Sequence, residues 1–182
     1  MVDLREASRQ KMQKSEAPRL NADDLKAEVN KRLAKYQGRN PLELFALFIG
    51  GAQLLEIRLK YLLSCKYGVD QESLDRSTLG QVKEQLKAFG LRGDYIFLLE
   101  SVVNYRNYVA TQLMADHIML DYLLDGKAVR FDVVTLFRGT FELEQLMFLY
   151  DWCEEHDAWD LGRSVRPAAC ATERSNSVTA GP

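Results

Sequence analysis

The sequence has few of the residues that bind metals or carry covalent chemistry. Among its 182 residues are two histidines and three cysteines, and no two cysteines form a CxxC pair. Structural zinc sites take four such ligands, usually in closely spaced pairs, so we expect neither a metal nor a cofactor. An odd number of unpatterned cysteines is typical of reduced thiols, and we therefore expect a cytoplasmic protein.

A charge excess and a long apolar run are also absent. The formal net charge of −2 provides no overall field to attract nucleic acid, so a nucleic-acid site would have to be a local patch. The most apolar stretch, residues 42–59, is interrupted by Gln53, Glu56 and Arg58, so we expect no membrane span. The pair Gly50-Gly51 lacks the following Lys-Ser/Thr of a phosphate-binding loop.

What the sequence does contain favours helices throughout. Apolar residues recur every three or four positions, and helix-capping residues such as Asn21 and Asn40-Pro41 precede these segments. The pattern predicts an all-α antiparallel bundle of about five helices. The predicted helices are residues 22–37, 41–66, 78–89, 93–125 and 132–156, within a domain of residues 21–161. The polar ends, an arm at 1–20 and a tail at 162–182, are predicted to be disordered.

The longest predicted helix, residues 93–125, carries polar residues on its apolar stripe. Arg106 lies four residues after Val102 and three before Val109. His117 follows on nearly the same face, eleven residues after Arg106. A guanidinium keeps its charge, so an Arg on a core-facing stripe must contact a carboxylate, water or a ligand. Arg106 is therefore the first candidate for a functional residue.

A second charged residue, Glu56, occupies the predicted inward face of the helix at 41–66. If the two helices are neighbours, Glu56 and Arg106 would form an ion pair that leaves guanidinium donors for a ligand. The alternative is a buried salt bridge that only fixes the register of the two helices. His117 is about 16 Å from Arg106 along the helix axis, so both cannot contact one phosphate within a single chain.

Two segments, residues 78–90 and 98–120, resemble the HEPN (higher eukaryotes and prokaryotes nucleotide-binding) domains. In that family a short helix precedes a long one that carries Arg-Asn-x-x-x-His, and Arg106-Asn107 matches the start of this motif. The likeness covers roughly residues 41–125. Many active members are metal-independent endoribonucleases of toxin–antitoxin and phage-defence systems.

The resemblance also implies how a site would be built. HEPN sites form across a homodimer: the Arg binds phosphate, the His transfers protons and an acidic residue from an earlier helix orients the Arg. Glu56 matches the last role. The family's His, however, is replaced here by Thr111, and a hydroxyl cannot accept and return a proton near neutral pH as imidazole does.

These residues lead to one prediction and two alternatives. The prediction is a catalytically degenerate HEPN-like domain that binds RNA, a nucleotide or a protein partner such as an antitoxin. Its binding residues would be Arg106, Asn107, Thr111 and Glu56. The first alternative is an active ribonuclease in which Arg106, Glu56 and a His117 from the other subunit are catalytic. The second is a non-enzymatic helical adaptor, in which Arg106 and Glu56 serve only as a structural pair.

Overall fold

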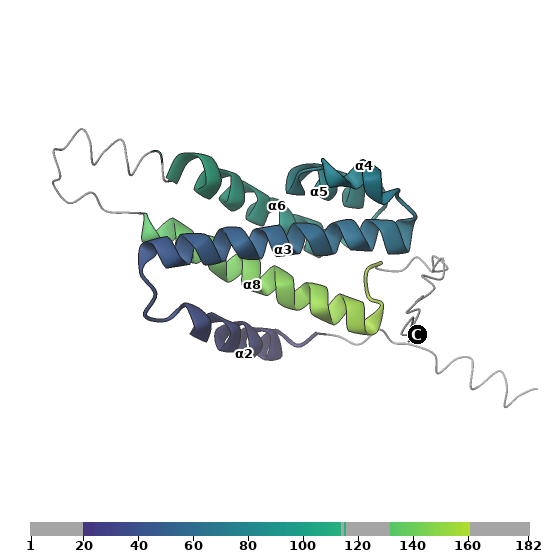
Figure 1. Cartoon of the computed structure of the whole chain (residues 1–182). Helices are drawn as coiled ribbons and strands as arrows, with labels where there is room; N and C mark the ends of the chain where they lie inside the picture. The colour runs from purple at the N-terminus through teal and green to yellow at the C-terminus, as the bar shows by residue number, and fades with distance from the viewer. Residues whose placement is uncertain (1–19, 114, 116–131, 161–182) are drawn as a thin grey trace, which may run out of the picture.

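The computed structural model describes residues 20–113, 115 and 132–160, and this part of the chain is a helical bundle without a strand (Figure 1). The predicted all-α fold is confirmed. The elements in chain order are α2 (Ala22–Leu33), the 3-10 turn η1 (Ala34–Tyr36), α3 (Pro41–Tyr67), α4 (Gln71–Asp75), α5 (Leu79–Ala88), α6 (Gly93–Tyr108), the π-helical turn η2 (Val109–Leu113) and α8 (Val133–His156). The predicted tail and the predicted arm, except Leu20, lie outside the described residues.

Capping residues fix where the helices begin. The Asn40 side chain accepts a hydrogen bond from the Glu43 main-chain N–H, and the Glu43 carboxylate accepts one from the Asn40 main-chain N–H. Thr78 and Gln81 form the same reciprocal box at the start of α5. At the other end of α3, Gly68 adopts the left-handed conformation at φ 69°, which ends a helix at little cost for glycine.

One short helix replaces a predicted polar connection. Residues 69–77 were expected to be irregular, but α4 forms within them. Asp70 accepts a hydrogen bond from the main-chain N–H of Ser73, and Leu74 is fully buried. A cap and one core contact are therefore enough to order this single helical turn.

The long helices α3, α6 and α8 lie side by side, and each runs opposite to the long helix before it in the chain (Figure 1). Helix α8 contacts α2, α3 and α6, while α5 packs on α6 and α3. Helix α2 packs mainly on α8 and not on α3, its neighbour in sequence. Consecutive helices are therefore not all close neighbours in this bundle, and the ion pair of Arg32 with Asp151 helps to hold α2 on α8.

The buried face of α3 matches the predicted inward face in part. Of the predicted inward residues, Ala52, Leu59 and Leu63 are buried, whereas Phe45, Ile49 and Glu56 are only half-buried. The buried face consists of Leu44, Phe48, Ala52, Leu55, Leu59, Leu62 and Leu63. Helix α3 also has large apolar side chains on its outward face, so the period of its sequence does not define a single inward direction.

Helix α6 and the π-helical turn η2 cover the first part of the predicted helix at 93–125; residue 115 is again α-helical, and residues 114 and 116–125 lie outside the described part of the chain. The regular α-helix stops at Tyr108 and the chain continues as η2, whose Val109 and Leu113 are buried as expected. The Thr111 hydroxyl donates to the main-chain carbonyl of Asn107 at 2.6 Å. In an α-helix the Thr111 N–H would donate to this same carbonyl. The hydroxyl and the N–H of Thr111 therefore compete for one acceptor, and this competition accompanies the wider, π-helical turn. His117 lies outside the described residues.

Two glycines mark close contacts with α8. A Cβ atom on Gly139 would lie 3.1 Å from the Cβ of Tyr105, and one on Gly51 would lie 2.9 Å from Leu143 Cδ2. A Cβ on Gly50 would have no such neighbour within 4 Å. Of the glycine pair, therefore, Gly51 alone makes a close contact with α8, and Gly50 faces open space.

We expect opposite effects from adding one methyl group at Gly139 and at Gly50. Gly139→Ala should lower the free energy of unfolding by about 1–2 kcal/mol, because α6 must move away from α8. Gly50→Ala should raise it by up to about 1 kcal/mol, because only helix propensity changes. Urea denaturation followed by circular dichroism measures both. Equal effects in the same direction would contradict the packing described for Gly139.

Candidate functional site

Three predicted binding residues lie together where α6 passes into η2. Arg106 is half-buried, whereas Asn107 and Thr111 are exposed. Arg106 Nη1 donates to Asn107 Oδ1 at 3.2 Å, and the Thr111 hydroxyl donates to the Asn107 carbonyl. Asn107 therefore connects the other two, and the three side chains form one polar surface, which we call the Arg106 surface.

Glu56 is not part of the Arg106 surface. Its Oε1 atom is 2.9 Å from Lys60 Nζ, one turn further along α3. Among the described residues, Arg106 has the neutral Asn107 as its hydrogen-bond partner and no carboxylate. The structure thus does not bring Glu56 and Arg106 together as an ion pair. Glu56 is only half-buried and lies at the edge of the buried face of α3.

A cavity of about 390 Å³ lies beside the tyrosines that flank Arg106 and is lined by Ser101, Asn104, Tyr105, Tyr108, Asp132 and Thr135. Asp132 accepts hydrogen bonds from the Thr135 N–H at 3.0 Å and from the Tyr108 hydroxyl at 3.4 Å. Hydrogen bonds from Thr135 and Tyr108 hold the pKa of Asp132 below its usual value. The carboxylate is therefore ionised at neutral pH and disfavours a phosphate in this cavity.

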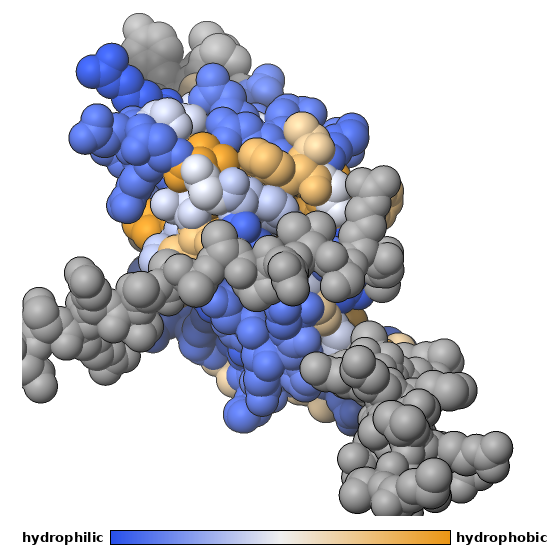
Figure 2. All heavy atoms as spheres, turned by 90° about the vertical axis from the view of Figure 1, so that its right-hand side faces the viewer, coloured by the Kyte–Doolittle hydropathy of each residue, from blue (hydrophilic) through white to orange (hydrophobic). Residues whose placement is uncertain are grey.

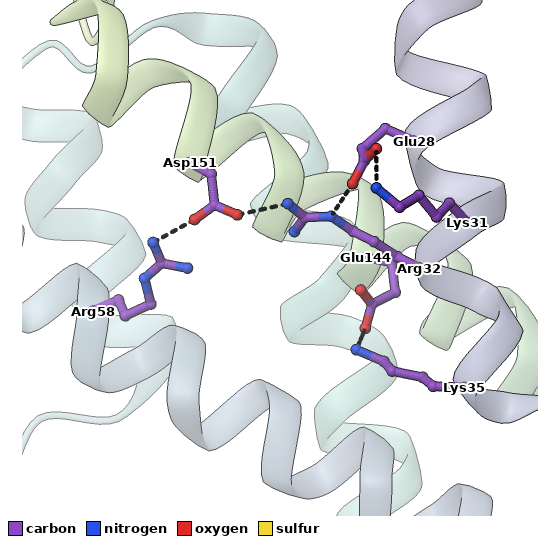
Figure 3. Close-up of polar contacts among 7 residues, drawn as sticks. All are labelled: Glu28, Lys31, Arg32, Lys35, Arg58, Glu144 and Asp151. Carbon is purple, nitrogen blue, oxygen red and sulfur yellow. Dashed lines mark hydrogen bonds and ion pairs between the residues drawn. The ribbon is translucent and has the colours of Figure 1, made fainter.

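A charged network joins α2 and α3 to α8 (Figure 3). Asp151 on α8 accepts hydrogen bonds from Arg32 at 2.8 Å and from Arg58 at 2.5 Å. Burial alone would raise the pKa of Asp151, but the hydrogen bonds from Arg32 and Arg58 outweigh it and keep that pKa below its usual value. The Arg58 guanidinium also lies over the Tyr150 ring, 4.0 Å from its centroid.

A second group of polar contacts, separate from this network, contains a buried carboxylate (Figure 3). Glu144 is 4% exposed, accepts a hydrogen bond from the Tyr36 hydroxyl and lies 2.7 Å from Lys35 Nζ. Burial, together with this carboxylate, raises the pKa of Tyr36 far above its usual value. Because Asp151 and Glu144 each have donors or cations beside them, we interpret both groups of contacts as structural links between helices.

These contacts are not among the predicted sites, although the sequence carries a signal for them. Glu144 stands between Leu143 and Leu146 on a strongly apolar helix, so it is, like Arg106, a charged residue among apolar ones. Its partners Lys35 and Tyr36 lie in η1, more than one hundred residues earlier, so periodicity could not identify them.

The described residues offer little for metal chemistry. Within residues 20–113, 115 and 132–160, no three His, Cys, Asp or Glu side chains are grouped to hold a metal ion. Cys65 and Cys153, the described cysteines, are not joined by a disulfide. No described helix has the length and apolar character needed to cross a bilayer. Figure 2, a view of one end of the bundle, shows mostly hydrophilic residues with separate hydrophobic patches.

The fold and these sites together define an all-α helical bundle with a cationic polar surface at the end of α6. No protein-family model, curated protein or solved structure matches this chain. The HEPN resemblance therefore stays a prediction that depends on Arg106, Asn107 and the segments around them.

We expect the Asp151 network to stabilise the fold in a pH-dependent way. Asp151→Asn should lower the free energy of unfolding at pH 7 by about 1 kcal/mol, a value reduced for partial exposure of the carboxylate. Because folding lowers the pKa of Asp151, its stabilisation is present above the unfolded pKa of about 3.9 and is lost as pH falls through the folded pKa. Urea denaturation over this pH range measures the free energy of unfolding of the native protein and of Asp151→Asn. The difference between the two values should disappear in acid, and a difference that stays constant with pH would contradict the role assigned to Asp151.

Proposed function

We propose that this chain is a HEPN-like helical domain that binds single-stranded RNA through the Arg106 surface without cleaving it. The observation that carries the proposal is the state of Arg106. Its guanidinium has five N–H donors, and among the described residues it uses one, toward the neutral amide of Asn107. A half-exposed cation without a carboxylate partner is suited to a phosphate oxygen.

The chemistry at Thr111 favours binding over cleavage. The Thr111 hydroxyl donates to the Asn107 carbonyl, and no imidazole or carboxylate of the described residues forms a hydrogen bond with it that could activate it. Glu56, the predicted orienting acid, is paired with Lys60. The Arg106 surface therefore offers a guanidinium that can bind a phosphate, but none of its three residues can transfer a proton near neutral pH. This supports a binding site without catalytic activity. The π-helical turn beneath it is a feature often found at functional sites.

We expect Arg106→Ala to weaken binding of a fluorescein-labelled single-stranded RNA by about tenfold or more, since a charge-assisted phosphate contact is lost. The slope of log affinity against log salt should fall by about 0.7. Arg76→Ala removes another exposed Arg and should leave both quantities unchanged. Fluorescence anisotropy at several salt concentrations measures them. No RNA binding by the folded native chain would overturn the proposal.

The same three proteins and Thr111→His also test for cleavage. A gain of RNA cleavage in Thr111→His, absent from the native chain, would support a binding site that lacks only its proton-transfer group. Cleavage by the native chain that Arg106→Ala abolishes would instead support the active ribonuclease with His117 supplied by another subunit, and would show the non-catalytic proposal to be wrong.

Assembly with a second copy is the second candidate function, and the outward face of α3 favours it. Leu47, Leu54, Ile57 and Tyr61 are between 40% and 63% exposed, and their spacing of seven, three and four places them on one face of the helix. A row of large exposed apolar side chains is uncommon on a monomer. Gly50, on the same face, leaves open space.

A second copy of this chain suits that face because a two-fold interface must be self-complementary. In an antiparallel pairing of two α3 helices, the apolar row of each chain would pack against the same row of the other chain. This pairing would provide the homodimer that the HEPN resemblance implies, with α3 at the interface.

We expect Ile57→Glu to convert a native dimer into a monomer in analytical ultracentrifugation, because it buries a charge in the interface. Phe97→Glu changes a large apolar residue on α6 that is more exposed than Ile57 and should leave the dimer intact. Circular dichroism should show both variants folded. A native chain that is monomeric well above micromolar concentration would exclude this assembly.

A further inference from the structure

The cavity beside Tyr105 and Tyr108, about 390 Å³ in volume, has the opposite charge to the neighbouring Arg106 surface. We call it the Asp132 cavity. It lies where the end of α6 meets the start of α8, and its volume falls in the range of small-molecule sites, about 300–1,000 Å³. Among the described residues its lining contains one acid, Asp132, and no Lys or Arg. A ligand in this cavity therefore meets a negative charge.

The Asp132 carboxylate belongs to the wall of this cavity. Both of its oxygens contact other lining residues: Oδ1 accepts from the Thr135 main-chain N–H at 3.0 Å, and Oδ2 accepts from the Tyr108 hydroxyl at 3.4 Å. Asp132 is half-buried, and burial affects its pKa less than the hydrogen bonds from Thr135 do, so the carboxylate is accessible from solvent. An ionised carboxylate has about four acceptor positions, so these two bonds leave positions for a ligand.

The charge of Asp132 is not neutralised by a cation in contact with it. Among the described residues, its hydrogen-bond partners are the neutral groups of Thr135 and Tyr108. The charge of Arg138 adds only a smaller effect to the lowered pKa of Asp132, and Arg138 does not line the cavity. An ionised carboxylate in this setting attracts a cationic hydrogen-bond donor.

Two tyrosines and two further polar residues complete the lining. Tyr105 and Tyr108 lie three residues apart on the same wall, both half-buried, and Tyr105 packs closely against Gly139 of α8. A cation beside a tyrosine ring face is attracted by the ring quadrupole, and the apolar part of the ring suits methylene groups. Ser101 and Asn104 add oxygens that accept hydrogen bonds.

We propose that the Asp132 cavity binds a primary alkylammonium ion. A primary ammonium has three N–H donors and no acceptor, and the cavity offers acceptors for them in Asp132, Ser101 and Asn104. The charge-assisted hydrogen bond to the carboxylate provides most of the affinity, while the alkyl chain lies along the tyrosine rings. A quaternary ammonium has no N–H donor and lacks these bonds, and an anion is repelled. The site goes beyond the proposed RNA binding and does not depend on Arg106.

NMR titration of the isotope-labelled full chain tests the assignment, with putrescine, tetramethylammonium and acetate as probes at constant ionic strength. We expect putrescine to shift the amide signals of Tyr108 and Thr135 until they saturate. It should bind about tenfold or more tightly than tetramethylammonium, which cannot form the charge-assisted hydrogen bonds. Acetate should leave these signals in place. No saturable shift with putrescine, or equal affinities for the two cations, would overturn the proposal.

Asp132→Asn removes the charge and keeps the cap of α8, because Asn caps a helix about as well as Asp. It should lower putrescine affinity about tenfold or more, since a charge-assisted hydrogen bond is lost. Asp70→Asn is the matched control: Asp70 caps α4 through the Ser73 N–H, as Asp132 caps α8, but it does not line the cavity. The control should bind putrescine like the native chain. A folded Asp132→Asn with native affinity would overturn the proposal.

Ser101→Leu tests the position of the ligand without changing the cap of α8. The larger side chain on the α6 wall occupies part of the cavity, so it should weaken putrescine binding, while circular dichroism shows the helices intact. If this folded variant binds putrescine with native affinity, the ligand lies elsewhere and the assignment to the Asp132 cavity fails.

Arg106→Ala and Arg138→Ala test the sign of the bound charge. Each removes a positive charge from the neighbourhood of Asp132, so each should raise putrescine affinity or leave it unchanged. Arg106→Ala should do so even where it weakens RNA binding. A loss of putrescine affinity in either folded variant would show that the ligand is not held as a cation at Asp132.

A lysine side chain carries the same group as a free amine, and a further probe distinguishes the two sources. A short Gly-rich peptide with a single Lys is titrated beside putrescine into the native chain and into Asp132→Asn. Binding of either probe that requires Asp132 supports the proposal, and the tighter probe identifies the source. Binding of both that is unchanged in Asp132→Asn would overturn it.

Discussion

The close approach of α6 to α8 at Gly139 is the contact on which the arrangement of this bundle depends. With no side chain at that position, the Cβ of Tyr105 lies within 3.1 Å of where a Gly139 Cβ would be, and α8 can contact α6 and α3 together. Tyr105, which precedes Arg106 in the chain, is positioned by this contact. The end of α6, and with it the Arg106 surface, therefore depends on packing against a helix that begins more than twenty residues later in the chain.

Polar contacts determine the position of α2, the shortest of the long-range partners of α8. Helix α2 buries a single residue, Val29, which is too little apolar area to specify its position. Arg32 reaches Asp151, and Lys35 and Tyr36 reach the buried Glu144. Since a buried carboxylate strongly disfavours any packing that removes its partners, these contacts select one position of α2 on α8. That position in turn forms a cavity between the end of α2 and the start of α8.

The three surfaces considered for function differ in chemistry and place. The Arg106 surface is polar and cationic, and it lies on a helix end whose π-helical turn exposes Thr111. The α3 face is apolar and continuous over four turns, which suits a protein contact. The Asp132 cavity combines an ionised carboxylate with two tyrosine rings. Because no residue belongs to two of these surfaces, RNA binding, assembly and amine binding can be lost independently.

What the sequence determined by itself was local. The all-α class and the caps at Asn21 and Asn40 could be predicted because helix formation and capping depend on neighbours within one or two turns. The buried positions Leu99, Val102 and Val109 followed from the same periodicity. The tertiary structure alone decided which face of α3 points inward, since a helix that is apolar on several sides has no preferred direction without its partners. It also separated Glu56 from Arg106, and it brought Asp132 beside Tyr108 and Glu144 beside Tyr36. These are contacts between distant segments, and no local pattern encodes them.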